Sequence, residues 1–318
     1  TFLSLEHGIP CADTFRRVFA AIDPKQFEAC FMKWIQHLAK DITGKVVAID
    51  GKTLRSSYDR EDRTSTIHMV SAYAAANKLV LGQIKTDAKS NEITAIPELL
   101  ALLDIKGCLV SIDAMGCQTE IAETILQQGG DYLLAVKGNQ PKLFEAVRQA
   151  LAPLAATPLC AETMTLEKAH GRIDGREYHV MAAGELAAQF PHWKQLHSIG
   201  VAISYRVENM QKITIEQRYF ISSKALVQDE FARAVRGHWA IENSLHWVLD
   251  VTMGEDDCPI YRGDAAEILA CIRHMGLNML RAETSRKASV RRKQKIAGMS
   301  SEYLETVLNA GLKKLGEI

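Results

Sequence analysis

The stretch KVVAID at residues 45–50 decides the fold, because a short apolar run that stops at an aspartate is typical of a buried strand. A second run of the same kind, CLVSID, occupies residues 108–113. If the two strands are neighbours in a parallel sheet, Asp50 and Asp113 emerge close together at one edge. Two adjacent carboxylates repel each other unless a cation lies between them, so the pair indicates a metal site. For either aspartate alone, a simple turn after a strand is the commoner explanation.

The segments around these runs predict the rest of the sheet. Further strands are expected at residues 66–74, 79–85 and 132–136, and helices at residues 93–104 and 120–128. The three early strands can pair as an antiparallel meander, with a turn at Asn77-Lys78. The two later strands need helical crossovers and therefore lie parallel to the first. This connectivity predicts an α/β fold of the ribonuclease-H-like class, with a mixed sheet and flanking helices.

The chain length of 318 residues predicts one large domain with an inserted piece. An Ala/Pro-rich entry and strand-like segments around residues 178–181, 199–203 and 213–215 favour a β-rich insertion docked beside the catalytic sheet. The chain opens on Thr1 rather than Met, so we expect the N-terminal segment to be truncated. The expected divisions are a helical segment at 1–44, the first part of the core at 45–148, the insertion at 149–227, and the core completion with a basic helical tail at 228–318.

The composition excludes some classes of protein. A hydrophobic content of 47% and a charged content of 24% are ordinary for a globular protein, and no stretch approaches a membrane span or a signal peptide. The 38 basic and 38 acidic residues cancel, so only a local patch can attract nucleic acid. The seven cysteines are odd in number and lack C-x-x-C spacing, which disfavours a zinc site or disulfide framework and favours the cytoplasm.

The stretch HWAIENSLHW at residues 238–247 places one acidic residue, Glu242, among large apolar side chains. A buried carboxylate needs a partner, and a metal ion is one; a solvent-facing glutamate is the alternative. His238, Glu242 and His246 are spaced by four residues and share a helix face. A zinc site on this face is a further alternative, although no H-E-x-x-H motif or cysteine supports it.

Several long motifs resemble the H-repeat-associated transposases of bacterial insertion sequences, some of which occur with Rhs elements. The motifs are VAIDGKT at 47–53, KSNEI at 89–93, IDAMGCQ at 112–118, VKGNQ at 136–140, HGR at 170–172 and HWAIEN at 238–243. They run in the same order across nearly the whole chain. The resemblance implies a ribonuclease-H-like DDE domain with a β-rich insertion before the glutamate. It also implies that Asp50, Asp113 and Glu242 are the catalytic triad and the metal ligands.

The same resemblance implies a cofactor and partners. The triad would hold two Mg²⁺ (or Mn²⁺) ions about 4 Å apart, which would activate an attacking water or 3′-hydroxyl and stabilise the leaving oxygen. The expected partner is double-stranded DNA, as transposon ends and target, and a homodimer is expected in the bacterial cytoplasm at the nucleoid. The broader group of insertion-bearing transposases carries Tyr, Arg and Lys around the glutamate. This chain has Val235, His238 and Leu249 there, so those roles do not transfer.

The candidate DNA contacts are basic residues outside the triad. Lys137 follows the strand at 132–136, and Arg291, Arg292 and Lys293 lie in a run that has no acidic residue. This density suits contacts to the DNA backbone, and a solvated basic helix is the alternative. The GKT triplet at 51–53 superficially resembles a phosphate loop, but that motif requires a glycine where Val46 stands, so no nucleotide cofactor is expected.

These observations together predict DNA transposition by metal-dependent strand cleavage and joining. A catalytically silent DNA-binding remnant is the alternative from another class, favoured by the truncated start and the substituted positions. A metal-dependent nuclease that cuts without joining is a third.

Overall fold

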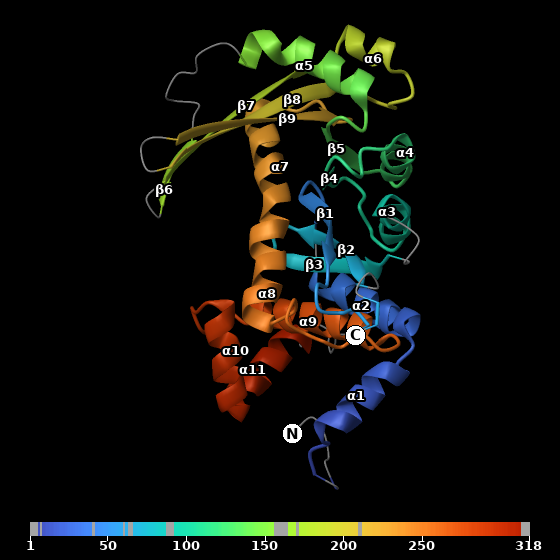
Figure 1. Ribbon diagram of the computed structural model, residues 1–318, viewed down its shortest axis with the longest axis vertical. Helices are drawn as coiled ribbons and strands as arrows, with labels where there is room; N and C mark the ends of the chain where they lie inside the picture. The colour runs from blue at the N-terminus through green and yellow to red at the C-terminus, as the bar shows by residue number, and fades with distance from the viewer. Residues whose placement is uncertain are drawn as a thin grey trace.

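The strand β1 (Val46–Thr53) is the third strand of the sheet and lies between β2 and β4. The computed structural model describes residues 6, 8–39, 42–59, 61–62, 66–86, 92–155, 165–169, 172–208 and 212–312. Within these residues, nine strands form one sheet in the order β3-β2-β1-β4-β5-β9-β8-β7-β6. Helices cover both of its faces (Figure 1).

The first five strands have the expected connectivity. The strand β1 pairs antiparallel with β2, and β2 pairs antiparallel with β3, while β1, β4 and β5 run parallel to one another. The parallel pairings follow from the helical crossovers α3 and α4. The order of these strands confirms the ribonuclease-H-like arrangement predicted from the sequence. Their bounds are β2 His68–Ala74, β3 Leu79–Lys85, α3 Glu92–Ala101, β4 Leu109–Ile112, α4 Thr119–Gln127 and β5 Asp131–Val136.

The end of β1 differs from the prediction. The strand was expected to stop at Asp50, but it continues to Thr53 because β2 stays in register alongside it as far as His68. Gly51 permits this, since a Cβ there would lie 2.2 Å from Oε1 of Glu92. Asp50 therefore lies within a paired strand rather than in a loose turn.

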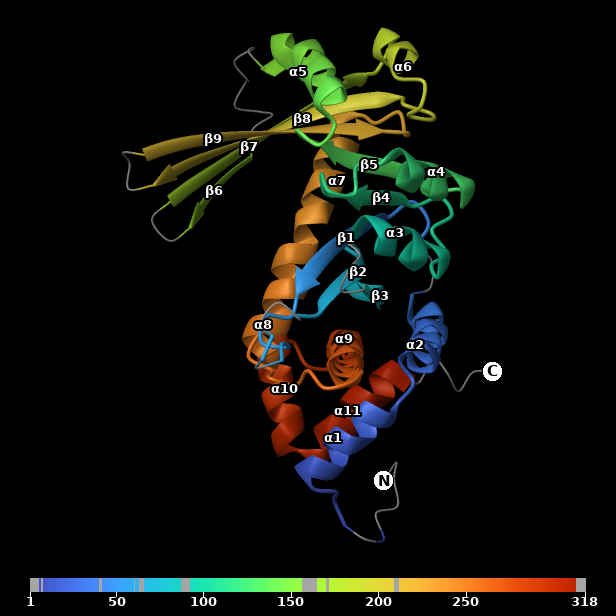
Figure 2. The same ribbon diagram turned by 45° about the vertical axis from the view of Figure 1, so that its right-hand side comes forward.

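The strands of the insertion extend the main sheet. The last of them, β9, pairs antiparallel with β5, from Leu133 opposite Ser222 to Val136 opposite Tyr219. The expectation of a subdomain docked beside the sheet is therefore wrong, because the edge of β5 that faces away from β4 is hydrogen-bonded to β9 of the insertion. Figures 1 and 2 show these long strands at one end of the sheet, with α5 and α6 over them. Their bounds are α5 Pro141–Ala155, β6 Thr165–Ala169, β7 Arg172–Ala182, α6 Glu185–Gln189, β8 Ser198–Glu208 and β9 Lys212–Ser222.

A long helical run crosses the opposite face of the sheet (Figure 2). It consists of α7 (Gln228–Ala240), the π-helix η1 (Ile241–His246) and α8 (Trp247–Met253). The helix α7 contacts β1 and β4, the two strands that carry the aspartates. The side chains of Val47, Ala48 and Ile49 are fully buried because helices pack on both faces of β1.

The remaining helices pack at the other end of the molecule (Figure 1). In α2, Pro24 takes the first position and Asp23 caps the helix by accepting from the Gln26 amide at 3.1 Å. None of the described helices is both long and apolar enough to cross a membrane. The bounds are α1 Ala12–Ala21, α2 Pro24–Leu38, α9 Ala265–Ala282, α10 Val290–Met299 and α11 Ser301–Leu312.

Candidate active site

The two aspartates occupy matching positions on neighbouring parallel strands. Ile49 of β1 stands opposite Ile112 of β4, and Asp50 and Asp113 each come next. Asp113 is held by a turn, because its Oδ1 accepts from the amides of Met115 at 3.0 Å and Gly116 at 3.3 Å. Both carboxylates therefore emerge at one edge of the sheet.

Glu242 reaches this edge from the long helical run. It lies in the π-helix, where the Trp247 amide donates to the Glu242 carbonyl across a widened turn, a feature frequent at functional sites. Its carboxylate, Asp50 and a ring nitrogen of His246 have ligand atoms that all lie within 4.8 Å of one another. Of the two alternatives for Glu242, the solvent-facing one holds, since the residue is exposed. Asp113 lies outside this group of three, although its charge acts on Asp50.

The electrostatics of Asp50 indicate a cation site. Burial, together with the charges of Glu242, Asp113 and Glu92, raises the pKa of Asp50 to about 8, against the lowering effect of the Gly51 amide. A carboxylate in this environment is costly to ionise unless a positive charge binds beside it.

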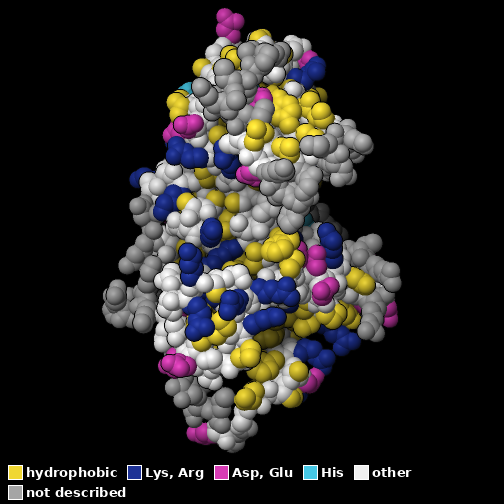
Figure 3. Space-filling view, turned by 90° about the vertical axis from the view of Figure 1, so that its left-hand side faces the viewer, with side chains coloured by type: hydrophobic (Ala, Val, Ile, Leu, Met, Phe, Trp, Pro, Cys, Tyr) yellow, Lys and Arg dark blue, Asp and Glu magenta, His cyan; other side chains and the backbone are white. Residues whose placement is uncertain are grey.

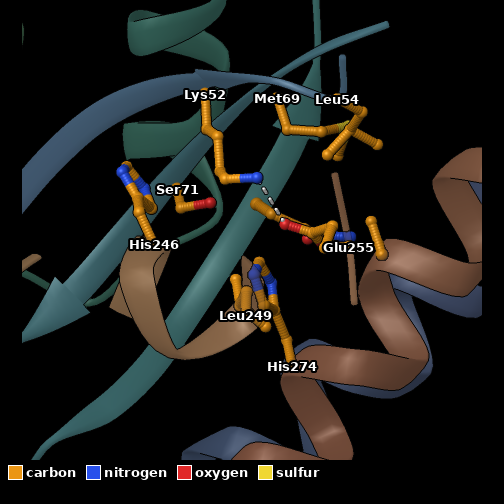
Figure 4. A pocket seen from close by; sticks show the side chains of 10 residues that line it. Lys52, Leu54, Met69, Ser71, His246, Leu249, Glu255 and His274 are labelled. Carbon is orange, nitrogen blue, oxygen red and sulfur yellow. Dashed lines mark hydrogen bonds and ion pairs between the residues drawn. The ribbon is translucent and has the colours of Figure 1, made fainter. Parts of the chain in front are cut away.

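Lys52, on the same strand as Asp50, pairs with carboxylates outside the acidic cluster. Nζ of Lys52 lies 2.6 Å from Asp250, 3.1 Å from Glu255 and 2.9 Å from Asp256, and its side chain is only 11% exposed. Figure 4 shows Lys52 directed toward Glu255. Lys52 therefore ties β1 to the segment after α8.

A histidine that the sequence interpretation did not assign to the site belongs to this cluster. Nδ1 of His246 lies 3.6 Å from Oδ2 of Asp50. Burial and the positive charge of Lys52 together lower the pKa of His246 to about 4, so the ring is neutral at pH 7. The four-residue spacing from Glu242 was the available signal, but it only suggested a zinc alternative. Burial lowers the pKa of His238, the third residue of that face, and the negative charge of Asp113 opposes this shift.

A cavity opens beside Asp113, with a volume of about 150 Å³. Lys137, which follows β5 and is exposed, lines this cavity. Arg218 and Trp239 also line it, and the Trp239 ring lies under the guanidinium groups of Arg218 at 5.2 Å and Arg176 at 5.3 Å. The sequence did not indicate these arginines, because they come from two strands of the insertion.

The basic run in α10 divides into exposed and buried members. Arg291 and Arg292 are exposed. Figure 3 shows that Lys and Arg side chains gather on one side of the molecule. Lys293 is 7% exposed, and its Nζ donates to the Leu280 carbonyl at 3.1 Å and pairs with Glu283 at 3.3 Å. The expectation that Lys293 contacts DNA is therefore wrong, because its ammonium group is needed inside the helical end.

Replacing Lys293 with methionine is expected to lower the free energy of unfolding by about 3 kcal/mol, because Glu283 would be left as an unpaired buried charge. Burial raises the pKa of Glu283, but Ser285, Tyr303 and Lys293 together lower it to about 2. The stabilisation is therefore present above the usual carboxyl range near pH 4.5 and is lost as the pH falls toward about 2. Urea unfolding measures the effect. Arg291→Met makes the same change at an exposed position of this helix and should stay within about 0.5 kcal/mol of the parent.

Comparison with known proteins places this site in a family. A model described as a transposase DDE domain matches residues 41–279. The chain belongs to the DDE transposase domain family. A second model, for a segment associated with that domain, matches residues 1–35.

Two relatives from Escherichia coli K12 support the membership. The protein YbfL and the "H repeat-associated putative transposase YhhI" are each 47% identical to this chain over 309 residues, which cover 95% of it and 82% of the relative. The resemblance to H-repeat-associated transposases is thereby confirmed. A solved piggyBac transposase synaptic complex with hairpin DNA aligns with 96% of this chain and 60% of its own, with 11% identity and a TM-score of 0.49.

Proposed function

We propose that this DDE transposase cleaves and joins DNA strands with a divalent metal cofactor, and that Asp50, Asp113 and Glu242 are its catalytic metal ligands. The observation that carries the proposal is the environment of Asp50, a carboxylate that is only 14% exposed and whose pKa is raised to about 8 by burial and by the charges of Glu242, Asp113 and Glu92. A site that destabilises its own negative charge when empty of cations is suited to binding them.

The donors present fit Mg²⁺ or Mn²⁺. Carboxylate oxygens are the ligands that these hard cations prefer, and the exposed Glu242 leaves one side open to phosphate oxygens. A pair of such ions, when bound, would stabilise the attacking and leaving oxygens of the phosphoryl transfer. The chain's own part is to hold Asp50 and Asp113 rigidly on the sheet and to bring Glu242 to them on the helix.

The arginines and lysine around the cavity beside Asp113 suit the DNA backbone. Lys137 and Arg218 lie at its rim, within reach of a strand whose scissile phosphate sits at the acidic cluster. The exposed Arg291 and Arg292 offer a second, more distant contact. We propose double-stranded DNA, as transposon ends and target, for this surface, with a homodimer as the working unit at the bacterial nucleoid.

The cleavage assay tests this function. The protein is incubated with labelled duplex carrying the terminal repeats that flank its gene, with Mg²⁺, Mn²⁺, Ca²⁺ or a chelator. Nicked ends and joined products are expected with Mg²⁺ and Mn²⁺ and not with the chelator. Nicking without joined product would identify a nuclease, and binding without nicking under every condition would identify a silent remnant.

Substituting Arg291 and Arg292 together with alanine is expected to weaken binding to all DNA sequences about equally. When two phosphate contacts are lost, fewer counterions are released on binding. The slope of log affinity against log salt should therefore become shallower by about 2. A salt titration of DNA affinity measures this. The matched control replaces the exposed Lys106, between α3 and β4, and the exposed Lys142, in α5. An unchanged slope in the arginine variant would show that α10 is only a solvated basic helix.

A further inference from the structure

The imidazole of His246 lies between the acidic cluster and the body of the protein. Its Nδ1 is 3.6 Å from Oδ2 of Asp50, which is longer than a hydrogen bond. The ligand atoms of Asp50, Glu242 and His246 nevertheless lie within 4.8 Å of one another. The residue is 7% exposed, so the ring is sequestered while the carboxylate of Glu242 is open to solvent. The geometry is that of a donor set rather than of a hydrogen-bonded pair.

The spacing of these atoms suits one ion. Two ligand atoms that are each about 2.1 Å from a cation lie between about 3 Å and about 4.2 Å apart, according to the angle between them. The separation of 3.6 Å between Nδ1 and Oδ2 falls inside this range. We infer that His246 supplies a nitrogen ligand to the metal ion held by Asp50 and Glu242. The inference rests on the proposed metal-dependent function and adds a ligand to the three acidic residues.

The other side of the ring is built to hold it in place. His246 lines a cavity of about 10 Å³ together with Lys52, Glu255 and His274, and Figure 4 shows these side chains around it. Among the residues that the structure describes, Nε2 of His246 has no hydrogen-bond partner, nor do Oε1 of Glu255 and Nδ1 of His274. A cavity of this size takes about one water molecule, which needs two to four polar neighbours. A water shared by these atoms would keep the proton on Nε2 and leave Nδ1 free to bind metal.

The charge of Lys52 does not oppose a cation here. Its ammonium group is surrounded by Asp250, Glu255 and Asp256 at 2.6 to 3.1 Å. These three carboxylates offset the charge of the lysine behind His246. The ring thus lies between the caged lysine and the acidic edge.

A nitrogen donor changes which metal binds best. Imidazole favours the later divalent metals over Mg²⁺, so a site with one histidine and two carboxylates should bind Mn²⁺ more tightly than Mg²⁺, by about tenfold or more. Replacing the histidine with glutamine should remove most of this difference, because an amide oxygen takes the place of the nitrogen.

The test uses Mn²⁺ as a paramagnetic probe of the purified chain. Electron spin echo modulation detects a nitrogen bonded directly to Mn²⁺, and labelling all histidines with ¹⁵N changes its frequency without altering the protein. The parent should show histidine nitrogen modulation, and His246→Gln should lose it, with a weakening of Mn²⁺ affinity of about tenfold or more. His238→Gln, a matched change on the same helical run beside Asp113, should keep the signal. Circular dichroism establishes that both variants are folded, and the isotope comparison needs no variant.

The outcomes separate this inference from the proposed function. If Mn²⁺ binds, and Asp50→Asn abolishes that binding, but the parent has no nitrogen modulation, His246 is not a ligand and the carboxylate site stands. If the signal is lost in His238→Gln and kept in His246→Gln, the wrong histidine has been assigned. If Mn²⁺ does not bind, or binds equally well to Asp50→Asn, the metal site of the proposed function falls together with this ligand.

Discussion

Replacing Asp113 with asparagine is expected to abolish strand cleavage while leaving DNA binding intact. The side chain keeps its size, and its oxygen can still accept from the amides of Met115 and Gly116, so the turn after β4 should survive. The charge that would bind metal is lost. Because a catalytic metal ion contributes several kcal/mol to the transition state, the cleavage rate should fall about a thousandfold or more. Single-turnover cleavage of labelled end DNA measures the rate, and a gel-shift titration measures binding.

Asp229→Asn is the matched control for this loss. It makes the same chemical change at an exposed position in the first turn of α7, away from the strand ends. Its cleavage rate should equal that of the parent. A parent-like rate in Asp113→Asn would remove this residue from the catalytic set, and a joint loss of binding and cleavage would indicate a structural role instead.

Divalent metal is expected to stabilise the fold, and to do so more at high pH than at low pH. The folded-state pKa of Asp50 is raised to about 8 from 3.8, so ionising this group costs the metal-free protein stability. The cost is absent below about pH 4, grows as the pH rises between these values, and is complete above about pH 8. A bound cation removes it. The rise in melting temperature on adding Mg²⁺ should therefore be larger near pH 9 than near pH 6.

The affinity for metal should also depend on the ionisation of Asp50. Below about pH 8 the cation must displace a proton from Asp50, so affinity should rise by up to about tenfold per pH unit and level off above that value. Calorimetric titration in buffers of different ionisation enthalpy measures the proton released. Asp50→Asn should abolish both the metal-dependent stabilisation and the proton release.

Glu28→Gln provides the control for these pH effects. Burial, together with the charges of Glu267 and Glu98, raises the pKa of Glu28 to about 7. Its removal should also reduce the loss of stability as the pH rises. Glu28 lies on α2, outside the group formed by Asp50, Glu242 and His246, so the response to Mg²⁺ should be unchanged. If both variants lose the metal response equally, the effect does not come from a site at Asp50.

The two aspartates could be found without a structure because their signal is local. Each ends an apolar run, and the crossover helix between the runs requires the strands to be parallel. That reasoning placed Asp50 and Asp113 on neighbouring strands, as the pairing of Ile49 with Ile112 shows. It misjudged the end of β1, because the partner that extends the strand is supplied by β2 and not by the run itself.

The insertion was harder to place from its sequence. Alternating apolar residues predicted strands, but alternation does not say which edge a strand will join. The pairing of β9 with β5 depends on contacts between residues far apart in the chain, such as Leu133 and Ser222, which are 89 positions apart. That contact also brings Arg176 and Arg218 to Trp239, beside the cavity at Asp113.

The sequence by itself determined the mixed sheet, the strand order of its first half, the family resemblance and the three acidic candidates, because short-range hydrophobic patterns and long motifs encode them. Only the tertiary structure decided which charged side chains are paired within the fold and which are available to bind a metal or DNA. Lys293 and Lys52 are ordinary lysines in the sequence, and the fold buries both against carboxylates. Glu242 looked buried among apolar neighbours, and the π-helix exposes it beside His246 and Asp50. Burial and charge pairing depend on which distant segments meet, and no local pattern carries that information.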